Sequence, residues 1–405
     1  MRWEKKKLND VCLSISDGDH QPPPKANKGV PFVTISNITN TNQFDFSNTM
    51  FVPQEYYDNL DPKRKAQEGD ILYSVVGSFG IPVYMKSNIP FVFQRHIAIL
   101  RPDVEKIAPD FLYYTMLDRD FYMKADAAAI GAAQRTISLT ALRNMEIEVP
   151  HIEMQKKISK VLSSYDNLIE NNHKQIKLLE EAAQRLYKEW FVDLRFPGHE
   201  DVAIVDGVPE GWYLCAIKDI CLRINAGGTP SRRNMNYWNN SKIKWYKTGE
   251  LQDCWLIDAE EYISEEGLNN SSAKIFPKNT IMMAIYASPT LGRLGILSSE
   301  AACNQAALCL VADEEIISWQ WLYHKLYELR DDFNAVAKGA GQQNISADVV
   351  KSKEVLLPSK ELIKKYTLIT KNMFNKRLAL QLQNKQLAEA RDRLLPKLMS
   401  GEIEV

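Results

Sequence analysis

The sequence is poor in the features that mark membrane, secreted and zinc-binding proteins. No apolar run approaches the roughly eighteen residues that a membrane-spanning helix needs, and no apolar segment follows the charged start of the chain to act as a signal peptide. The six cysteines never form a C-x-x-C pair, so a structural zinc site is unsupported and buried, reduced thiols are expected. We therefore expect a cytoplasmic protein.

The chain also lacks an excess of charge of either sign. Its 50 basic and 51 acidic residues give a formal net charge of −1, which argues against a protein that coats nucleic acid indiscriminately. A specific reader of DNA stays compatible, because its basic groups can be concentrated on one face. With 405 residues the chain is too long for one ordinary core, so two or more domains are expected.

Catalytic signatures are missing as well. The sequence has no phosphate-binding G-x-x-x-x-G-K-[ST] loop, no Asn/Asp-Pro-Pro-Tyr/Phe tetrapeptide of the amino-methyltransferases, and no H-E-x-x-H or G-x-S-x-G motif. The cluster Asp17-Gly18-Asp19-His20 has groups for metal binding or acid–base chemistry, but Gly and Asp in this arrangement favour a turn. We expect no catalytic residue, no metal site and no cofactor in this chain.

What the sequence does contain is an internal repeat. Residues 8–13 resemble residues 217–222, and residues 69–74 resemble residues 279–284. The offset between the copies drifts at first and becomes constant from Gln134 onward. A drifting offset is typical of strands joined by variable loops, whereas a constant one suits a helix, in which each inserted residue rotates all later side chains by about 100°. Each half is therefore predicted to be a β-rich domain, here called a head, followed by a long helix.

The periodicity of each helix predicts a coiled-coil seam. In the first copy the seam positions alternate four and three apart, and in the second the apolar residues recur every seven. The first seam comprises Ile158, Leu162, Tyr165, Ile169, Asn172, Ile176, Leu179, Ala183, Leu186 and Trp190, and the second Met373, Leu380, Leu387 and Leu394.

Two helices with one apolar stripe each most simply bury the stripes against each other as an antiparallel pair. A helix from about Gln155 to Phe191 would be about 55 Å long, with one head at each end and an approximate twofold axis between the halves. Asn172 interrupts the first seam: it either fixes the register of the pair at a cost in stability or faces solvent, and the sequence leaves both interpretations open.

Prolines mark where the helices begin, since Pro150 and Pro358 precede them. The predicted fold is α+β in four segments: a head at 1–150, a helix region at 151–196, a second head at 197–358 and a second helix region at 359–405.

Each head carries loop segments rich in small and hydrogen-bonding residues. Glycine permits close backbone approach, while Gln and Asn suit adenine and Arg suits guanine in the major groove. Taken singly such a segment is an ordinary loop, but both halves place one about a dozen residues before the proline that opens the helix. The candidate DNA-contacting residues are Gln134, Arg135, Gly227, Gly228, Thr229, Ser231, Arg232, Gln342, Gln343 and Asn344.

These features together resemble the specificity (S) subunits of Type I restriction-modification enzymes. The resemblance rests on the duplicated plan, on residues 227–231 followed by Tyr237-Trp238 and residues 243–245, on Asn304-Gln305, and on the equal spacing from Ile-Ser to Pro in both halves. The closing residues 393–403 are similar to the usual end of the family. The first head departs from this pattern, with residues 16–20 where the second head has residues 226–230.

The resemblance implies that each head is a target recognition domain that reads one half of a split, asymmetric DNA site, with an unread spacer set by the helix pair. It implies a complex with two methyltransferase (M) subunits that methylates adenine N6, and further restriction (R) subunits that add ATP-dependent translocation and DNA cleavage. The S-adenosylmethionine, ATP and Mg would belong to those partners. A pair of equivalent docking faces on the helices is compatible with two copies of one partner.

Two alternatives belong to other classes. A coiled-coil scaffold with two protein-binding heads would not shift a duplex that carries a split site more than a scrambled one. An enzyme with an unrecognised site in one head would show acidic or nucleophilic residues kept in one half only, and no convincing set is present.

Overall fold

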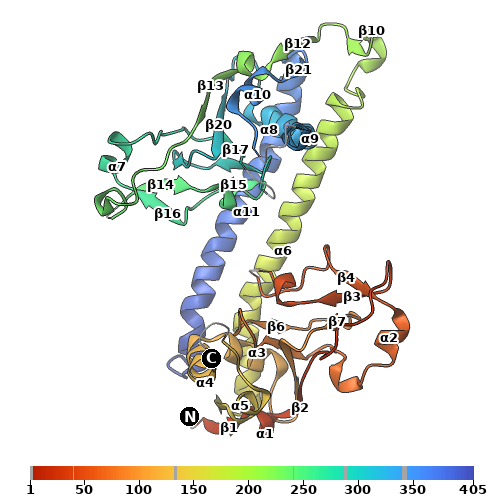
Figure 1. Cartoon of the computed structure of the whole chain (residues 1–405), viewed down its shortest axis with the longest axis vertical. Coiled ribbons are helices and arrows are strands. Elements are labelled where there is room, and N and C mark those ends of the chain that lie inside the picture. Colours follow the sequence, from red (N-terminus) through yellow and green to blue (C-terminus); the bar gives the residue numbers. More distant parts are fainter. Residues whose placement is uncertain (1–2, 40, 132–134, 240, 287–289, 340–343) are drawn as a thin grey trace. The chain divides into compact units, whose positions relative to one another are not determined.

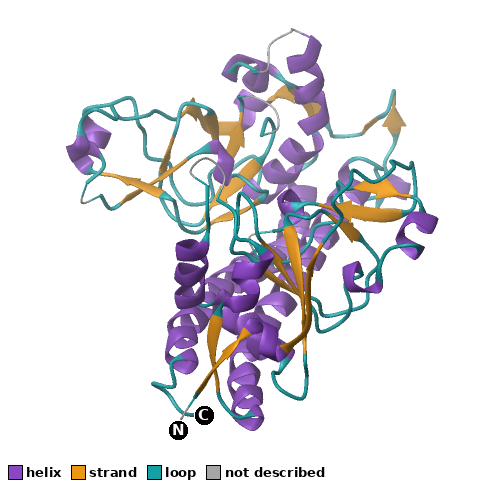
Figure 2. Ribbon diagram, turned by 60° about the horizontal axis from the view of Figure 1, so that its bottom comes forward, coloured by secondary structure: helices purple, strands orange, loops and turns teal. Residues whose placement is uncertain are grey.

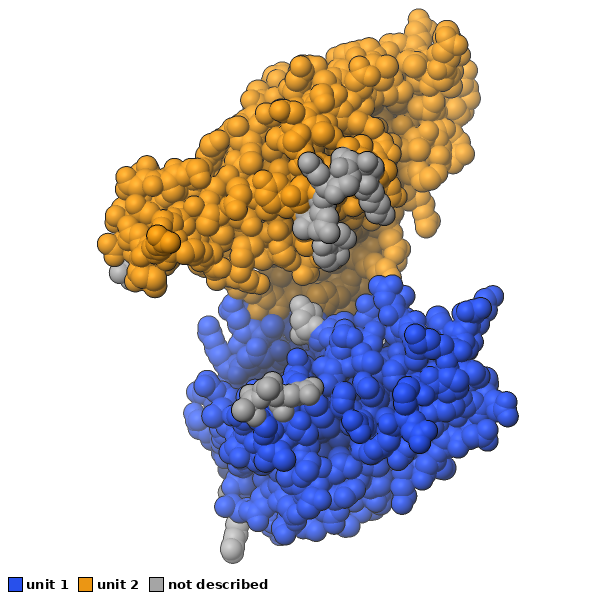
Figure 3. Space-filling view, viewed as in Figure 1, with its two compact units in different colours: residues 1–169, 386–405 blue, residues 170–385 orange. Residues whose placement is uncertain are grey.

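The computed structural model describes all residues except 1–2, 40, 132–134, 240, 287–289 and 340–343. Its chain divides into two compact units, Met1–Ile169 with Gln386–Val405 and Glu170–Lys385 (Figure 3). Each unit holds one head together with part of both long helices. Within the described residues no helix is long and apolar enough to cross a membrane.

The long helices are α6 (Ile152–Phe191) and α11 (Lys360–Met399), each of 40 residues (Figure 1). Both begin two residues after the predicted prolines. Before α11, the Ser359 hydroxyl accepts a hydrogen bond from the Leu362 amide at 3.4 Å. Before α6, His151 Nδ1 accepts one from the Met154 amide at 3.3 Å. These contacts satisfy amides that have no partner inside the helix.

The two helices run antiparallel in each unit. In the first unit Asp166 pairs with Arg391 and Lys157 with the last residue of the chain. In the second unit Asn172 pairs with Asn384 and Glu180 with Arg377, so numbers rise along α6 as they fall along α11. The predicted α+β class and the antiparallel pairing are confirmed. The twofold relation between the halves concerns how the units are placed and stays a prediction.

The first head contains a four-stranded sheet, a three-stranded sheet and a two-stranded ribbon. The orders are β2 (Cys12–Asp17), β8 (Ile97–Pro102), β5 (Ile71–Ser74), β6 (Pro82–Tyr84); β4 (Met50–Val52), β3 (Val30–Val33), β7 (Val92–Phe93); and β1 (Glu4–Lys7), β9 (Glu146–Val149). Its helices are α1 (Leu8–Val11), α2 (Gln54–Asp58), α3 (Pro109–Leu117), α4 (Arg119–Ala128) and α5 (Leu139–Asn144), with 3₁₀ turns η1 (Ile35–Asn37) and η2 (Pro62–Arg64).

The second head repeats this plan with additions. Its sheets are β13 (Cys221–Ala226), β20 (Ala307–Ala312), β17 (Ile281–Ala284), β18 (Leu294–Leu297), β15 (Cys254–Leu256); β16 (Glu261–Ile263), β14 (Ile243–Tyr246), β19 (Ala302–Cys303); β12 (Tyr213–Ala216), β21 (Glu354–Leu357); and the hairpin β10 (Ile204–Val205), β11 (Val208–Pro209). Its helices are α7 (Glu265–Asn269), α8 (Trp319–Glu328), α9 (Arg330–Gly339) and α10 (Ala347–Ser352), with 3₁₀ turns η3 (His199–Asp201), η4 (Ile217–Ile220), η5 (Met235–Tyr237) and η6 (Thr248–Glu250).

The strand orders confirm the internal repeat. β2-β8-β5-β6 matches β13-β20-β17-β18, and β4-β3-β7 matches β16-β14-β19, including the parallel pairs β3–β7 and β14–β19. β15 and the β10–β11 hairpin have no counterpart in the described part of the first head. Figure 2 shows the strands gathered in the heads, while the long helices carry none.

Each head packs onto the helix pair through its apolar core. In the first unit the core joins Phe111 of α3 to Ile158 and Leu162 of α6 and to Leu398 of α11. In the second unit it joins Trp321 of α8 to the end of α6 and the start of α11. The apolar core of each head therefore includes residues of both long helices.

The predicted seam residues are buried to different degrees. Ile158, Leu162, Ala183, Trp190 and Leu380 are buried, as is Asn172, whereas Tyr165, Ile169, Ile176, Leu179, Leu186, Met373, Leu387 and Leu394 are half-buried.

The structure decides between the two interpretations of Asn172. The side chain is buried, and its amide donates to Asn384 Oδ1 at 2.8 Å and to Gln383 Oε1 at 3.1 Å on the facing helix. A slip of one helix would separate the buried Asn172 from the buried Asn384 and leave each side chain without this partner, at about 1–3 kcal/mol each. Asn172 therefore fixes the register of α6 against α11 within the second unit.

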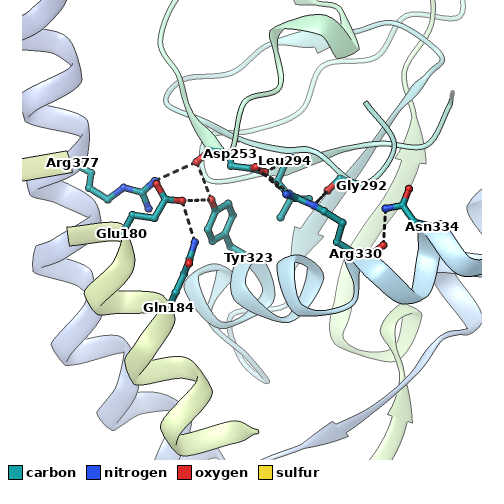
Figure 4. Close-up of polar contacts among 9 residues, drawn as sticks. All are labelled: Glu180, Gln184, Asp253, Gly292, Leu294, Tyr323, Arg330, Asn334 and Arg377. Atoms are coloured by element: carbon teal, nitrogen blue, oxygen red, sulfur yellow. Dashed lines mark hydrogen bonds and ion pairs between the residues drawn. The ribbon is translucent and has the colours of Figure 1, made fainter. Parts of the chain in front are cut away.

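A cluster of charged residues around the buried Arg377 ties the second head to the helix pair (Figure 4). Arg377 of α11 lies 3.1 Å from the Glu180 carboxylate of α6 and donates to the Asp253 carbonyl at 3.2 Å. The same carbonyl accepts from the Tyr323 hydroxyl at 2.9 Å. The Asp253 carboxylate in turn holds Arg330 of α9 by two hydrogen bonds, one of 3.0 Å. The cluster therefore links both long helices to α8, α9 and the segment before β15.

His324 makes the stability of the second unit sensitive to acid. The ring is buried, with Nδ1 2.7 Å from the Tyr366 hydroxyl and 3.1 Å from the Gln320 carbonyl. Burial, and secondarily the Arg377 charge, lower the pKa of His324 to about 3. Between about pH 6.5 and pH 3 the unfolded chain binds a proton that the folded chain does not, so stability falls as pH falls through this window. We expect a loss on the order of 2 kcal/mol between pH 7 and pH 5.

Urea titrations at both pH values measure this loss, and His324→Gln is the comparison because it removes the titrating group. The variant should show a shallower pH dependence than the wild type over that range. Equal slopes would contradict the assignment.

Candidate nucleic-acid interface

In each head, two loops that follow two different strands lie against each other, and we call them the paired loops. In the first head they are residues 18–21, after β2, and residues 94–96, after β7. The Asp19 amide donates to the Phe93 carbonyl at 2.8 Å, and the Arg95 amide donates to the Asp19 carbonyl at 2.9 Å. These backbone bonds fix both loops whatever their side chains are.

The paired loops of the second head are residues 227–230 and 304–306. The Gly227 amide donates to the Ala307 carbonyl at 3.1 Å, as the Gly18 amide does to the Ile97 carbonyl at 3.2 Å. The Gly228 amide donates to the Cys303 carbonyl at 2.9 Å, in the place of the Asp19 bond. The two heads therefore share one loop scaffold.

The scaffold requires glycine at one position. A Cβ on Gly227 would lie 2.2 Å from the Cys303 carbonyl oxygen, and one on Gly18 would lie 2.2 Å from the Phe93 carbonyl oxygen. Pairing residues 16–20 with residues 226–230 from the sequence was therefore wrong by one position, because Gly18 corresponds to Gly227. The first head keeps the glycine and the two backbone hydrogen bonds beside it, while its side chains differ.

The side chains at the tips of the paired loops are polar and differ between the heads. Arg95 and Gln305 occupy equivalent positions, and both are exposed. In the first head, His20 of the other paired loop is also exposed. In the second head, the Thr229 hydroxyl donates a hydrogen bond to the Gln305 side chain. Arg95 and Gln305 were missed as candidates, although the match of Phe93-Gln94-Arg95 with Cys303-Asn304-Gln305 was visible in the sequence.

In the second head, two tryptophans contact Ser231 and Arg232, which follow the first of the paired loops. The Arg232 guanidinium lies 3.6 Å from the centre of the Trp238 ring and forms an ion pair with Glu261. The hydrogen bond that the Arg232 guanidinium donates to Glu261 lowers the pKa of the Glu261 carboxyl. The Trp238 indole donates to the Ser231 carbonyl at 3.2 Å, and the Trp245 indole to the Gly228 carbonyl at 2.9 Å. Ser231 and Arg232 stay exposed on a backbone that these indoles fix.

Five candidate residues lie in the segments that precede the long helices, and the structure describes two of them. Arg135 folds back onto α4, where its guanidinium lies 2.9 Å from the Asp126 carboxylate, and it is half-buried. Asn344 is exposed. Gln134, Gln342 and Gln343 lie outside the described residues. Ile137 and Ile345 anchor the two segments in the same way. Their amides donate hydrogen bonds of 3.0 Å to the carbonyls of Val75 and Ile285, which directly follow β5 and β17.

The acidic cluster at the end of β2 is paired internally. His20 Nε2 lies 2.7 Å from the Asp17 carboxylate, and the buried Asp19 carboxylate accepts a hydrogen bond from the Tyr56 hydroxyl. Burial, and then the bond to Asp19, raise the pKa of Tyr56 to about 12. In the described part of the chain no group of three or more His, Cys, Asp or Glu side chains is arranged to hold a metal ion.

Comparison with known proteins defines the class of the two modules. The family model described as "Type I restriction modification DNA specificity domain" matches residues 1–181 and again residues 209–388, one match for each head and part of its following helix. The chain belongs to this family of Type I restriction-modification specificity subunits.

Similar proteins agree with this membership. The chain is 24% identical to the Type I restriction enzyme HindI specificity subunit of Haemophilus influenzae, over 99% of both chains. It is 27% identical to the MjaIX specificity subunit of Methanocaldococcus jannaschii, over 74% of this chain and 70% of that protein. The crystal structure of the S subunit from M. genitalium matches 98% of this chain with a TM-score of 0.60 at 16% identity, which supports the fold.

Proposed function

We propose that this chain is the DNA-reading, non-catalytic subunit of a Type I restriction-modification complex, and that each head reads one half of a bipartite, asymmetric site. The observation that carries the proposal is the duplicated loop scaffold: two equivalent backbone hydrogen bonds in each head, from Gly18 and Asp19 and from Gly227 and Gly228, hold loops whose exposed hydrogen-bonding side chains differ. Two domains that recognise different half-sites need the same loop backbone with different side chains at the ends of the loops. An active site in one head would not require this duplication.

The paired loops suit base recognition because their backbone is rigid and their tips are polar. Arg95 is suited to guanine, whose N7 and O6 accept two hydrogen bonds from a guanidinium, and Gln305 is suited to adenine. Each such pair discriminates against a wrong base by about 1–3 kcal/mol. Arg232 and Lys247, both paired with Glu261 in the free protein, are suited to phosphates.

Exchanging the two tip residues should change what the heads read. In the variant Arg95→Gln with Gln305→Arg, each half-site should change its preferred base at one position, by about tenfold or more. Binding of the assembled complex to libraries randomised in one half-site measures this preference.

Arg119→Gln is the matched control, since it removes the same charge from an exposed position of the first head outside the paired loops. Unaltered base preference in the double variant would remove Arg95 and Gln305 as readers. A complex that does not favour any split site over a scrambled duplex would instead support the protein-binding scaffold.

Family membership and the duplication support a proposal for the partners. The chain would dock two methyltransferase (M) subunits and, through them, restriction (R) subunits. S-adenosylmethionine, ATP and Mg would be bound by those partners. A continuous helix of 40 residues, about 60 Å at 1.5 Å per residue, would serve as the element that sets the length of the unread spacer.

A further inference from the structure

One exposed apolar residue occurs at the same position of both heads. Leu13 of β2 is 68% exposed and Leu222 of β13 is 70% exposed. The two strands have the same burial pattern along all six residues. A single exposed apolar side chain is common and needs no explanation, but a leucine that is exposed at the same position of both heads does.

A β-bulge turns each leucine outward. The pairing of β2 with β8 shifts register between Cys12 and Ser14, and that of β13 with β20 shifts between Cys221 and Arg223. Without the bulge, Leu13 would share a face with the buried Ile15, two residues further along the strand. An extra residue in a strand redirects side chains in this way.

The cysteines before the leucines occupy the inward place instead. Burial raises the pKa of Cys12 and of Cys221 to about 12 in each case. Both heads therefore half-bury a small thiol and expose a larger leucine, although burying the leucine would stabilise the head more.

Among the residues that the structure describes, the other large exposed apolar side chains are not repeated in this way. Tyr213 and Leu214 of β12, 57% and 61% exposed, occupy the positions of Glu4 and Lys5 in β1. The repetition is thus particular to the bulge and is not a general property of the surfaces.

We propose that Leu13 and Leu222 are equivalent anchors for two copies of one protein partner, the methyltransferase subunit, with one copy on each head. The proposal rests on the proposed function. A partner present once could not use both positions, and the phosphates of DNA do not bind an isolated leucine.

The position of the bulge fits a partner that acts on DNA. Leu13 is the second residue of the strand that ends at the paired loop, and it lies five residues before Gly18, a distance of about 17 Å. Leu222 stands in the same relation to Gly227. A partner anchored at the bulge would thus lie within reach of DNA bound at the loop of the same head.

The test measures binding of the full chain to the methyltransferase subunit by native mass spectrometry and by titration. The variants are Leu13→Thr, Leu222→Thr and the double variant, since threonine keeps the strand propensity and removes the apolar end. Each single variant should keep one tight site and weaken the other by about ten- to a hundredfold, and the double variant should weaken both. Thermal unfolding of the free chain should be unchanged, because both side chains are exposed.

Val104→Thr is the matched control, since Val104 is 62% exposed in the first head and its equivalent in the second head is Glu314. A double variant that binds two methyltransferase subunits as tightly as the wild type would overturn the anchors, while the proposed function would stand. A wild-type chain that binds no methyltransferase subunit would overturn both.

Discussion

Replacing Arg377 by alanine should lower the free energy of unfolding by about 3–5 kcal/mol. The side chain is 1% exposed, and its guanidinium balances the Glu180 carboxylate 3.1 Å away. Without it, the partly buried Glu180 carboxylate loses its ion-pair partner and keeps only the weaker influence of Arg330, and the Asp253 carbonyl loses one of its donors. Alanine is the best helix former, so helix propensity opposes the loss.

The loss should depend on pH with a defined sign. Burial raises the pKa of Glu180 above its usual value, and the Arg377 charge acts against that rise. In the variant the pKa should rise further, so Glu180 becomes neutral at a higher pH. The destabilisation should therefore shrink as the pH is lowered from 8 toward 5.

Chemical denaturation of the wild type, Arg377→Ala, Glu180→Ala and the double variant measures these effects. Because each single variant leaves one buried charge unpaired, the double variant should lose less than the sum of the singles. Lys376→Ala is the control on the same turn of α11, where the side chain is exposed, and should change stability by less than about 0.5 kcal/mol. Additive losses would show that Arg377 and Glu180 do not act as a pair.

Replacing Gly227 by alanine should disrupt the paired loops of the second head. The new Cβ would lie 2.2 Å from the Cys303 carbonyl oxygen and 2.5 Å from the Asn304 carbonyl oxygen. Both contacts are to backbone, which cannot rotate away, so the loop that carries Gln305 must move. Overpacking of this kind costs about 1–3 kcal/mol of stability. We expect the complex to lose discrimination at the half-site of the second head and to keep it at the other.

Selection of binding sites from a duplex library, scored for each half-site, checks this expectation. Gly249→Ala is the matched control, because no atom lies within 4 Å of the position of its Cβ. Gly18→Ala should give the reverse result, with loss at the half-site of the first head. Equal loss at both half-sites from Gly227→Ala would mean that the heads do not read separately.

Sequence periodicity predicted the helices well because a helix depends on local pattern. Ten alternating positions and two prolines were enough to place α6 and α11 within a few residues. The duplication likewise predicted that both heads have one topology, which the strand orders confirm. The strands themselves were only outlined, since their partners lie far away in the chain.

The candidate site was harder to predict, because it depends on which backbones come together. Arg95 and Gln305 are separated in sequence from the loops they join, by about 75 residues in each head. The equivalence of Gly18 and Gly227 is defined by the hydrogen bonds around both glycines, which the sequence does not contain. The bulges at Leu13 and Leu222 broke the two-residue periodicity by which a strand is predicted.

The sequence by itself determined that this protein has two related β-rich modules and two long helices, because repeats and heptads are properties of neighbouring residues. Only the tertiary structure decided what those residues face. It buried Asn172 against Asn384, enclosed Arg377 with Glu180, and turned Leu13 out of a core that Ile15 enters. In each case the environment of the side chain depends on a segment that is distant in the sequence. The residues next to it in the chain do not reveal that segment.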